Sequence, residues 1–424
     1  MIEIKRKSID KIKWSIFLFI LIFNPPVVPH ANLFLTIISM LILLAKYRNN
    51  INNVLKKSRI NYWCFGAIIL FMYVLIIPLT VSLMLNDFVN TSHYVSLFNR
   101  FAVLFVTIIP CCTLLICMLD AKKYNYHFFL QTLISAGLIE GFFVILAFFS
   151  STAKSVFISL MAKNAPSELY QNEWYITVRS YGFAGTLVDL FGLGIAVIAG
   201  ISFFYGVLYQ QRYIIYSILI LIGALLNART GVVLYLISVS LGIIFLFQQR
   251  HIRTIFKTIW GIIIILLLSM GILKIVSINA ATRGWIWSLV NSFKNTIRMQ
   301  SMQGAMGKLF NQNFWELPDI FRAIIGTAHS KYAAEGYSHS DVGYINDIWL
   351  CGFVGCFILY GSLTKLLFNI FKNRKNIMFR FCSMHLILCF FIFNIKGCAY
   401  GYNPGMAAIL TIVFTLNYYV IKDK

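Results

Sequence analysis

The segment YIIYSILILIGALLNARTGVVLYLISVSLGIIFLF, residues 213–247, consists of two apolar runs joined by the short sequence NARTG at 227–231. Apolar runs of this kind recur along the chain, and many reach the length of about 18 residues that is typical of a transmembrane helix. The turn between the two runs carries Arg229. A permanently charged guanidinium is costly beside hydrocarbon, so this arginine is expected either to reach water or to have a specific role.

The composition of the chain agrees with a membrane location. Hydrophobic residues make up 59% of the sequence and charged residues 12%, with a mean hydropathy of +0.79. A soluble globular chain carries about twice that charged fraction. We therefore expect an all-α polytopic membrane protein that forms one membrane-embedded domain over residues 1–424, with no soluble domain and no internal repeat.

Twelve spans are predicted from the apolar runs. They lie near residues 14–27, 30–46, 62–85, 97–119, 128–150, 184–206, 212–227, 231–248, 255–276, 343–364, 378–396 and 403–421. The first two are short and could form a hairpin broken at Pro25 and Pro26.

The basic residues predict the orientation of these spans. Most of the 36 lysines and arginines fall on the side of the two chain ends, for example in the segment KYRNNINNVLKKSR at 46–59. A basic excess marks the cytoplasmic side, so both termini are expected in the cytoplasm. The loops at about 151–183 and 277–342 then face outward, to the periplasm. The formal net charge of +22 is mainly a topology signal, and no nucleic-acid partner is expected.

No cofactor or metal ion is expected from the motifs. The nine cysteines form no CxxC pair and no zinc-ligand spacing, and most lie inside apolar runs. The chain contains neither a DxD sequence nor a Walker A sequence.

Polar residues cluster at the end of the second outward loop, in the segment GYSHSDVGY at 336–344. His339 and Asp341 could supply a general base and the carboxylate that orients it, and Tyr344 is a candidate for binding the substrate. The simpler alternative is that His339 caps a helix or lies among lipid headgroups. Further along, Gly352 and Gly355 predict a close helix–helix contact.

Outward-facing arginines are the second candidate group. Guanidinium binds phosphate oxygens in a bidentate manner, so Arg179, Arg229 and Arg283 are candidates for binding a pyrophosphate. The alternative for each is a side chain that only extends to water. Two carboxylates lie inside predicted spans: Asp189, which could hold an arginine, and Glu140, which could be either a proton-relay group or a structural acid.

The segments LLNARTGVVLYL at 225–236 and GYSHSDVGYINDIWLCGFVG at 336–355, with a large outward loop before the second, resemble the bacterial O-antigen and capsule repeat-unit polymerases and the related O-antigen ligases. The resemblance implies a metal-independent glycosyltransferase of the inner membrane with its active face in the periplasm. Its donor and acceptor would be undecaprenyl-pyrophosphate-linked glycans, and its partners could include a chain-length regulator, a flippase and membrane lipid.

The same resemblance assigns roles to individual residues. Arg229 matches the arginine of the helix-turn motif, and His339 and Asp341 match the cluster at the loop end. Arg179 and Arg283 correspond only by location. One direct displacement by the acceptor hydroxyl would invert the anomeric carbon.

Two alternatives remain open. An O-antigen ligase would carry a histidine with a glycine pair closer downstream than His339 and Gly352 are here. A flippase or other transporter would fit twelve spans equally well, although transporters tend to show paired halves and discontinuous helices.

Overall fold

The structure is a computed structural model of the chain, and it describes residues 2–25, 31–84, 104–164, 182–184, 189–227, 229–248, 312–329, 331, 340–373, 376–401 and 403–422. All regular elements within these ranges are helices, and none is a strand. The all-α prediction is therefore confirmed for this part of the chain.

The first half contains α1 (Ile2–Phe23), α2 (Ala31–Lys46), α3 (Arg48–Lys57), α4 (Ile60–Met84), a π-helical turn at Leu104–Ile108 that leads into α6 (Ile109–Ala121), α7 (Tyr126–Phe149), and α8 (Ser151–Asn164). The second half contains α10 (Asp189–Leu208), α11 (Arg212–Asn227), α12 (Arg229–Gln248), the short η3 (Gln312–Trp315), α16 (Ile320–Ile325), α17 (Gly343–Phe371), α18 (Ile377–Phe393) and α19 (Pro404–Lys422).

Several helices match what a membrane span requires. Within the described residues, seven are long and apolar enough to cross a membrane, and the number is eight if the bent pair α2 and α3 counts as one span. Helices α11 and α18 are apolar but shorter. The architecture is thus compatible with a polytopic membrane protein. The predicted span at 255–276 lies outside the described residues, and the total of twelve spans and the orientation stay predictions.

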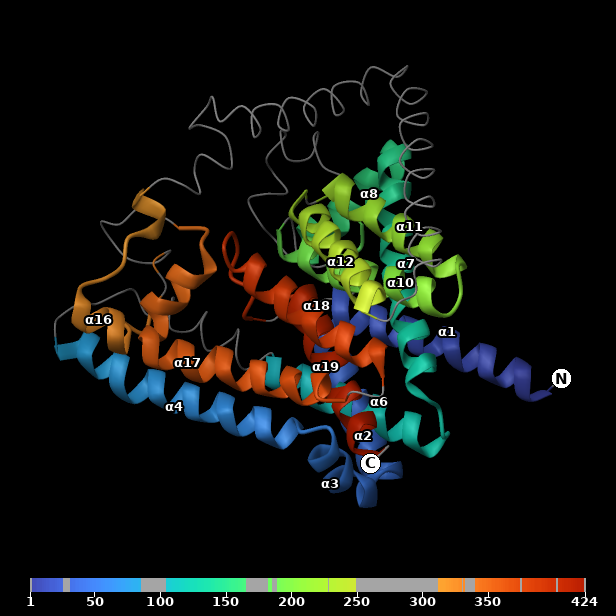
Figure 1. The fold of residues 1–424 in the computed structure, drawn as a ribbon, viewed down its shortest axis with the longest axis horizontal. Coiled ribbons are helices and arrows are strands. Elements are labelled where there is room, and N and C mark those ends of the chain that lie inside the picture. Colours follow the sequence, from blue (N-terminus) through green and yellow to red (C-terminus); the bar gives the residue numbers. More distant parts are fainter. Residues whose placement is uncertain are drawn as a thin grey trace.

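The buried share of each helix shows which helices are central in the bundle and which are peripheral. The spanning windows of α10 and α19 are 89% and 94% buried, whereas that of α4 is only 22% buried. Figure 1 shows α4 and α17 side by side, with α7, α10, α11 and α12 gathered at the other side of α18 and α19. Large apolar side chains of α4 such as Ile68, Met72 and Ile76 are exposed, as expected of a face that lipid covers.

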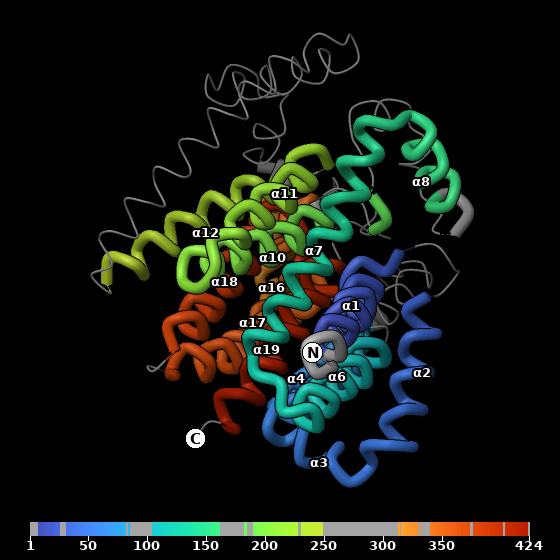
Figure 2. Tube along the Cα trace, turned by 90° about the vertical axis from the view of Figure 1, so that its right-hand side faces the viewer, coloured from blue at the N-terminus to red at the C-terminus, as the bar shows by residue number. Residues whose placement is uncertain are grey.

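The basic segment at 46–59 forms its own helix. Helix α3 turns away from α2 by 113°, and Figure 2 shows it at the opposite end of α2 from α8, with α2 at the edge of the bundle. Its polar sequence RNNINNVLKK buries only Val54. A short helix of this kind fits the water-exposed end of the bundle better than its apolar interior.

The outward loop predicted at about 151–183 is partly helical. Helix α8 follows α7 after the single residue Ser150, whose hydroxyl accepts a hydrogen bond from the Ala153 N–H. Phe157 and Met161 of α8 bury their side chains against Ala147 of α7. This packing stabilises a helix whose sequence alone is too polar to be a span.

Candidate functional site

Two of the predicted site positions lie at adjacent helix starts. Asp189 is the first residue of α10 and Arg229 the first residue of α12. The first turns of these helices touch at glycine, because a Cβ added to Gly231 would lie 2.8 Å from the Gly192 carbonyl oxygen. The absence of side chains at this crossing lets the two backbones approach closely. The starts of α10 and α12 are therefore neighbours.

The same end of the bundle includes the starts of α19 and α17. A Cβ added to Gly194 of α10 would lie 2.8 Å from the Pro404 Cβ, at the start of α19. The turn between α18 and α19 then reaches α17, where the Tyr344 N–H donates to the Asn394 carbonyl at 3.3 Å. We call this region, formed by the starts of α10, α12, α17 and α19 together with the α18–α19 turn, the site end.

The structure describes only some of the predicted site residues. Arg179, Arg283 and His339 lie outside the described residues, as do the side chains of Asp189 and Arg229. Asp341 is exposed and lies two residues before the first residue of α17, Gly343. Four predicted positions, Asp189, Arg229, Asp341 and Tyr344, thus belong to the site end.

The Tyr344 hydroxyl forms a hydrogen bond within the protein. The hydroxyl donates to the Phe391 carbonyl of α18 at 2.6 Å, and the ring packs edge-on against Tyr360 at a centroid distance of 5.8 Å. The backbone before it is also held in place, because the Asn346 amide donates to the carbonyls of Ser340 and Val342 at 2.8 and 3.0 Å. This geometry gives Tyr344 a positioning role at the start of α17.

Helix α17 is broken at Gly352, where φ is 62° and ψ is 179°. In an unbroken helix the carbonyls of Trp349 and Leu350 would accept from residues four positions later. Here they accept instead from the N–H groups of Thr327 and Ala328, at 2.7 and 3.0 Å. The loop after α16 therefore satisfies the carbonyls that the break releases. The predicted close contact at Gly352 exists: its nearest neighbours are the backbone atoms of Ile324 and Ile325 at the end of α16 and of Gly326 directly after it. Gly355 approaches a second helix, Tyr73 of α4.

A buried carboxylate lies in the first part of this broken helix. Asp347 is 3% exposed and accepts hydrogen bonds from the Tyr360 hydroxyl and, at 3.5 Å, from the Cys398 thiol. Burial, and secondly the Asp347 charge, raise the pKa of Tyr400 in the α18–α19 turn, so this phenol stays protonated at neutral pH. Sequence reasoning named only Glu140 and Asp189 as acids within spans. The missed signal was an acidic residue inside the predicted span 343–364.

Glu140 has two backbone partners. Its carboxylate is fully buried in α7 and accepts from the N–H groups of Phe183 and Ala184 at 3.2 and 3.1 Å. The Phe183 ring packs against Phe143 of α7 and Phe157 of α8, at centroid distances of 4.7 and 4.4 Å. The carboxylate thus holds the backbone just before α10 against α7. Of the two roles predicted for Glu140, this geometry favours the structural one.

The described end of the second outward loop is anchored by a buried lysine. The Lys331 side chain is fully buried, donates to the Asn313 carbonyl, and lies 3.2 Å from the Glu316 carboxylate. The Glu316 carbonyl accepts from the Trp349 indole at 3.1 Å. The ion pair holds Lys331 and Glu316 together, and the indole hydrogen bond ties Glu316 to α17; sequence reasoning did not single out this lysine.

The comparisons with known proteins leave the family open. No protein-family model matches the chain, and no curated protein matches it significantly. In the described part of the chain, no group of three His, Cys, Asp or Glu side chains is placed to hold a metal ion.

Proposed function

We propose that the protein is a membrane-embedded glycosyltransferase that polymerises undecaprenyl-pyrophosphate-linked oligosaccharide repeat units at the periplasmic face of the inner membrane. The observation that carries this proposal is that the two motif segments lie at the same end of the bundle, linked through the starts of α10 and α19 and the α18–α19 turn. NARTG at 227–231 and SDVGY at 340–344 are more than a hundred positions apart in the sequence, yet both belong to the site end.

The residues of the site end suit the chemistry of this transfer. The acceptor sugar hydroxyl attacks the anomeric carbon of the donor glycan, and the bond from that carbon to the pyrophosphate oxygen breaks. The pyrophosphate leaves with the electron pair, and Arg229 stabilises the developing negative charge. The hydroxyl proton passes to a base, for which His339 with Asp341 is the proposed pair. Arg179 and Arg283 are the further proposed pyrophosphate ligands, and the single displacement inverts the anomeric centre.

One observation favours a second candidate, a transporter of lipid-linked oligosaccharides. Transporters bind their cargo at broken helices, and α17 is broken at Gly352. In such sites the unwound carbonyls bind the cargo or the coupling ion. Here the carbonyls of Trp349 and Leu350 already accept from Thr327 and Ala328. The break is therefore occupied by the protein's own loop, and we place the polymerase first.

The surface polysaccharide of a strain that lacks this protein tests the proposal. We expect the lipopolysaccharide or capsule of this strain to carry a single repeat unit, because export and attachment continue without chain extension. A complete loss of attached sugar would instead favour a ligase or a flippase. Complementation with the wild-type chain should restore the full ladder and serves as the control.

A further inference from the structure

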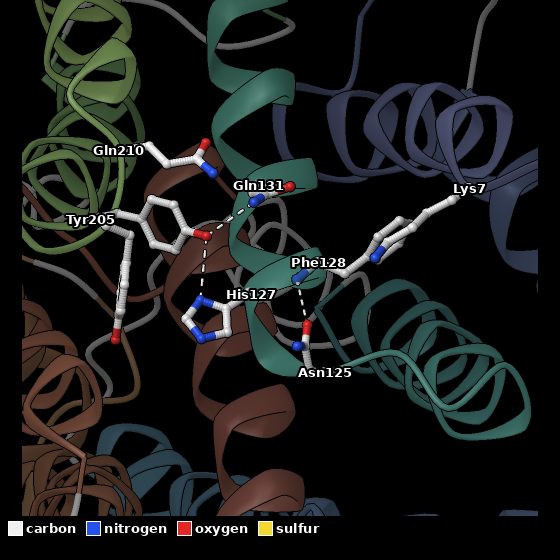
Figure 3. A pocket seen from close by; sticks show the side chains of 8 residues that line it. Lys7, Asn125, His127, Phe128, Gln131, Tyr205 and Gln210 are labelled. Atoms are coloured by element: carbon white, nitrogen blue, oxygen red, sulfur yellow. Dashed lines mark hydrogen bonds between the residues drawn. The ribbon is translucent and has the colours of Figure 1, made fainter. Parts of the chain in front are cut away.

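A polar pocket lies at the opposite end of the bundle from the site end. It has a volume of about 280 Å³ and is formed by Lys7 of α1, the start of α7 and the end of α10 (Figure 3). This volume is just below the roughly 300–1,000 Å³ of drug-sized ligand sites, so it suits a small polar group. The basic excess of the chain predicts that this end is cytoplasmic.

Hydrogen-bond donors predominate in the pocket. The Asn125 carbonyl oxygen accepts from the Phe128 N–H at 3.2 Å, which leaves the Asn125 amide hydrogens for other partners. Gln210 contributes a second, exposed amide, and Lys7 contributes an ammonium. The start of α7 adds the positive end of a helix dipole.

A hydrogen-bond chain orients the histidine of this pocket. The Gln131 amide donates to the Tyr205 hydroxyl oxygen at 3.0 Å, and that hydroxyl lies 3.3 Å from the His127 Nδ1 (Figure 3). In the arrangement in which the Tyr205 hydroxyl accepts from Gln131 and donates onward, its hydrogen is directed to Nδ1. Neutral imidazole then carries its proton on Nε2, which is a further donor.

The surrounding charge is positive. Among the side chains that the structure describes, no acidic one lines the pocket. The nearby Asp10 already accepts from Lys122 and from the Tyr124 hydroxyl. Lys11, one turn from Lys7 on α1, and Arg212 both approach the Tyr213 ring, at 6.0 and 5.3 Å. Burial and then the Arg212 charge lower the pKa of Lys11, as expected of a half-buried lysine beside a second cation.

We infer that this pocket binds the phosphate of an anionic phospholipid headgroup through Lys7, Asn125, His127 and Gln210. Basic pockets between transmembrane helices on the cytoplasmic side bind such headgroups. Tyr209 lines the pocket, and its hydroxyl lies 3.2 Å from that of Tyr126. Tyrosine is the kind of side chain that is enriched where headgroups meet acyl chains. The inference rests on the pocket and not on the proposed function.

Native mass spectrometry of the delipidated full chain, titrated with phosphatidylglycerol or phosphatidylcholine, tests the inference. We expect one phosphatidylglycerol to bind at least fivefold more tightly than phosphatidylcholine. Lys7→Gln should weaken phosphatidylglycerol binding about fivefold, the effect of one basic residue near a membrane surface. Lys56→Gln, which removes an exposed lysine of α3, is the matched control and should leave binding unchanged.

His127→Ala should weaken binding without removing a charge from the cluster, provided that the protein elutes as a single species. Equal affinity for the two lipids, or equal losses in the Lys7→Gln and Lys56→Gln variants, would overturn the inference. Displacement of phosphatidylglycerol by millimolar inorganic phosphate would show that the pocket takes a soluble phosphate, and would overturn the assignment to lipid.

Discussion

Gly326 and Gly352 meet backbone to backbone. A Cβ added to Gly352 would lie 2.5 Å from the Gly326 nitrogen, and one added to Gly326 would lie 2.7 Å from the Gly352 nitrogen. Both residues also have positive φ values, of 91° and 62°. Glycine is the residue that adopts this conformation at no steric cost, so this pair joins the outward loop to the break in α17.

Gly352→Ala should therefore lower stability markedly. The strained backbone alone costs about 1–3 kcal/mol, and the contact with Gly326 adds to it. The measurement is the apparent melting temperature of the purified protein. Gly361→Ala is the matched control on the same helix, since an added Cβ there meets no atom within 4 Å. Equal melting temperatures for the two variants would contradict the described break.

The two possible roles of Glu140 predict different results for Glu140→Gln. If the carboxylate is structural, the glutamine oxygen keeps one of the two backbone hydrogen bonds, and activity persists. Glu140→Ala removes both acceptors and leaves two N–H groups unpaired, at about 1–3 kcal/mol each, so the amount of folded protein should fall. Membrane protein level and polymer length should be measured together. Full loss of activity in Glu140→Gln at normal protein level would establish a proton relay.

Tyr344→Phe separates positioning from substrate binding. Loss of the hydrogen bond to the Phe391 carbonyl should cost about 1 kcal/mol of stability. At equal protein level, polymer length should stay as in the wild type, because the Tyr344 hydroxyl already donates to the Phe391 carbonyl of α18. A shorter ladder from a variant of normal stability would instead show that Tyr344 is a substrate-binding residue.

The ion pair of Asp10 with Lys122 predicts a pH dependence. Burial raises the pKa of Asp10, but the hydrogen bonds from Lys122 and Tyr124 outweigh it and lower the pKa overall. Asp10 thus stabilises the fold above the carboxyl pKa of the unfolded chain, about 4, and this contribution is lost as the pH falls through the lower folded-state value.

The melting temperature of Asp10→Asn should accordingly lie below that of the wild type at neutral pH. Asparagine keeps an acceptor for Tyr124, so the difference reports mainly the charge. The two proteins should converge as the pH falls below about 4. A gap that stays constant down to that pH would show that the carboxylate charge contributes nothing.

Most helices could be predicted from the sequence because long apolar runs have few alternatives in a membrane. The helical identity of 126–149, 189–208 and 404–422 follows directly from composition. Helix α8 was not predicted, since its polar sequence becomes helical through packing of Phe157 and Met161 on α7. The break at Gly352 was also missed, because it depends on donors that arrive from Thr327 and Ala328.

The candidate site could be predicted only in part. The motif residues were visible, but their grouping depends on contacts between glycines and distant backbone, such as Gly231 with Gly192 and Gly194 with Pro404. No local pattern encodes which helix faces these glycines. Asp347 and Lys331 were missed for a similar reason, since their partners Tyr360, Cys398 and Glu316 come from other turns or elements.

The most direct test of the proposed role of Arg229 in chain extension compares Arg229→Ala with Arg322→Ala. Each variant is expressed in the null strain, and the polysaccharide ladder is compared. Arg322 is the matched arginine, because its guanidinium already pairs with Asp319, the N-cap of α16, at 3.1 Å. We expect a single repeat unit for Arg229→Ala, and a full ladder for Arg322→Ala, at equal protein levels. A full ladder from Arg229→Ala would show that this arginine only extends to water and takes no part in the transfer.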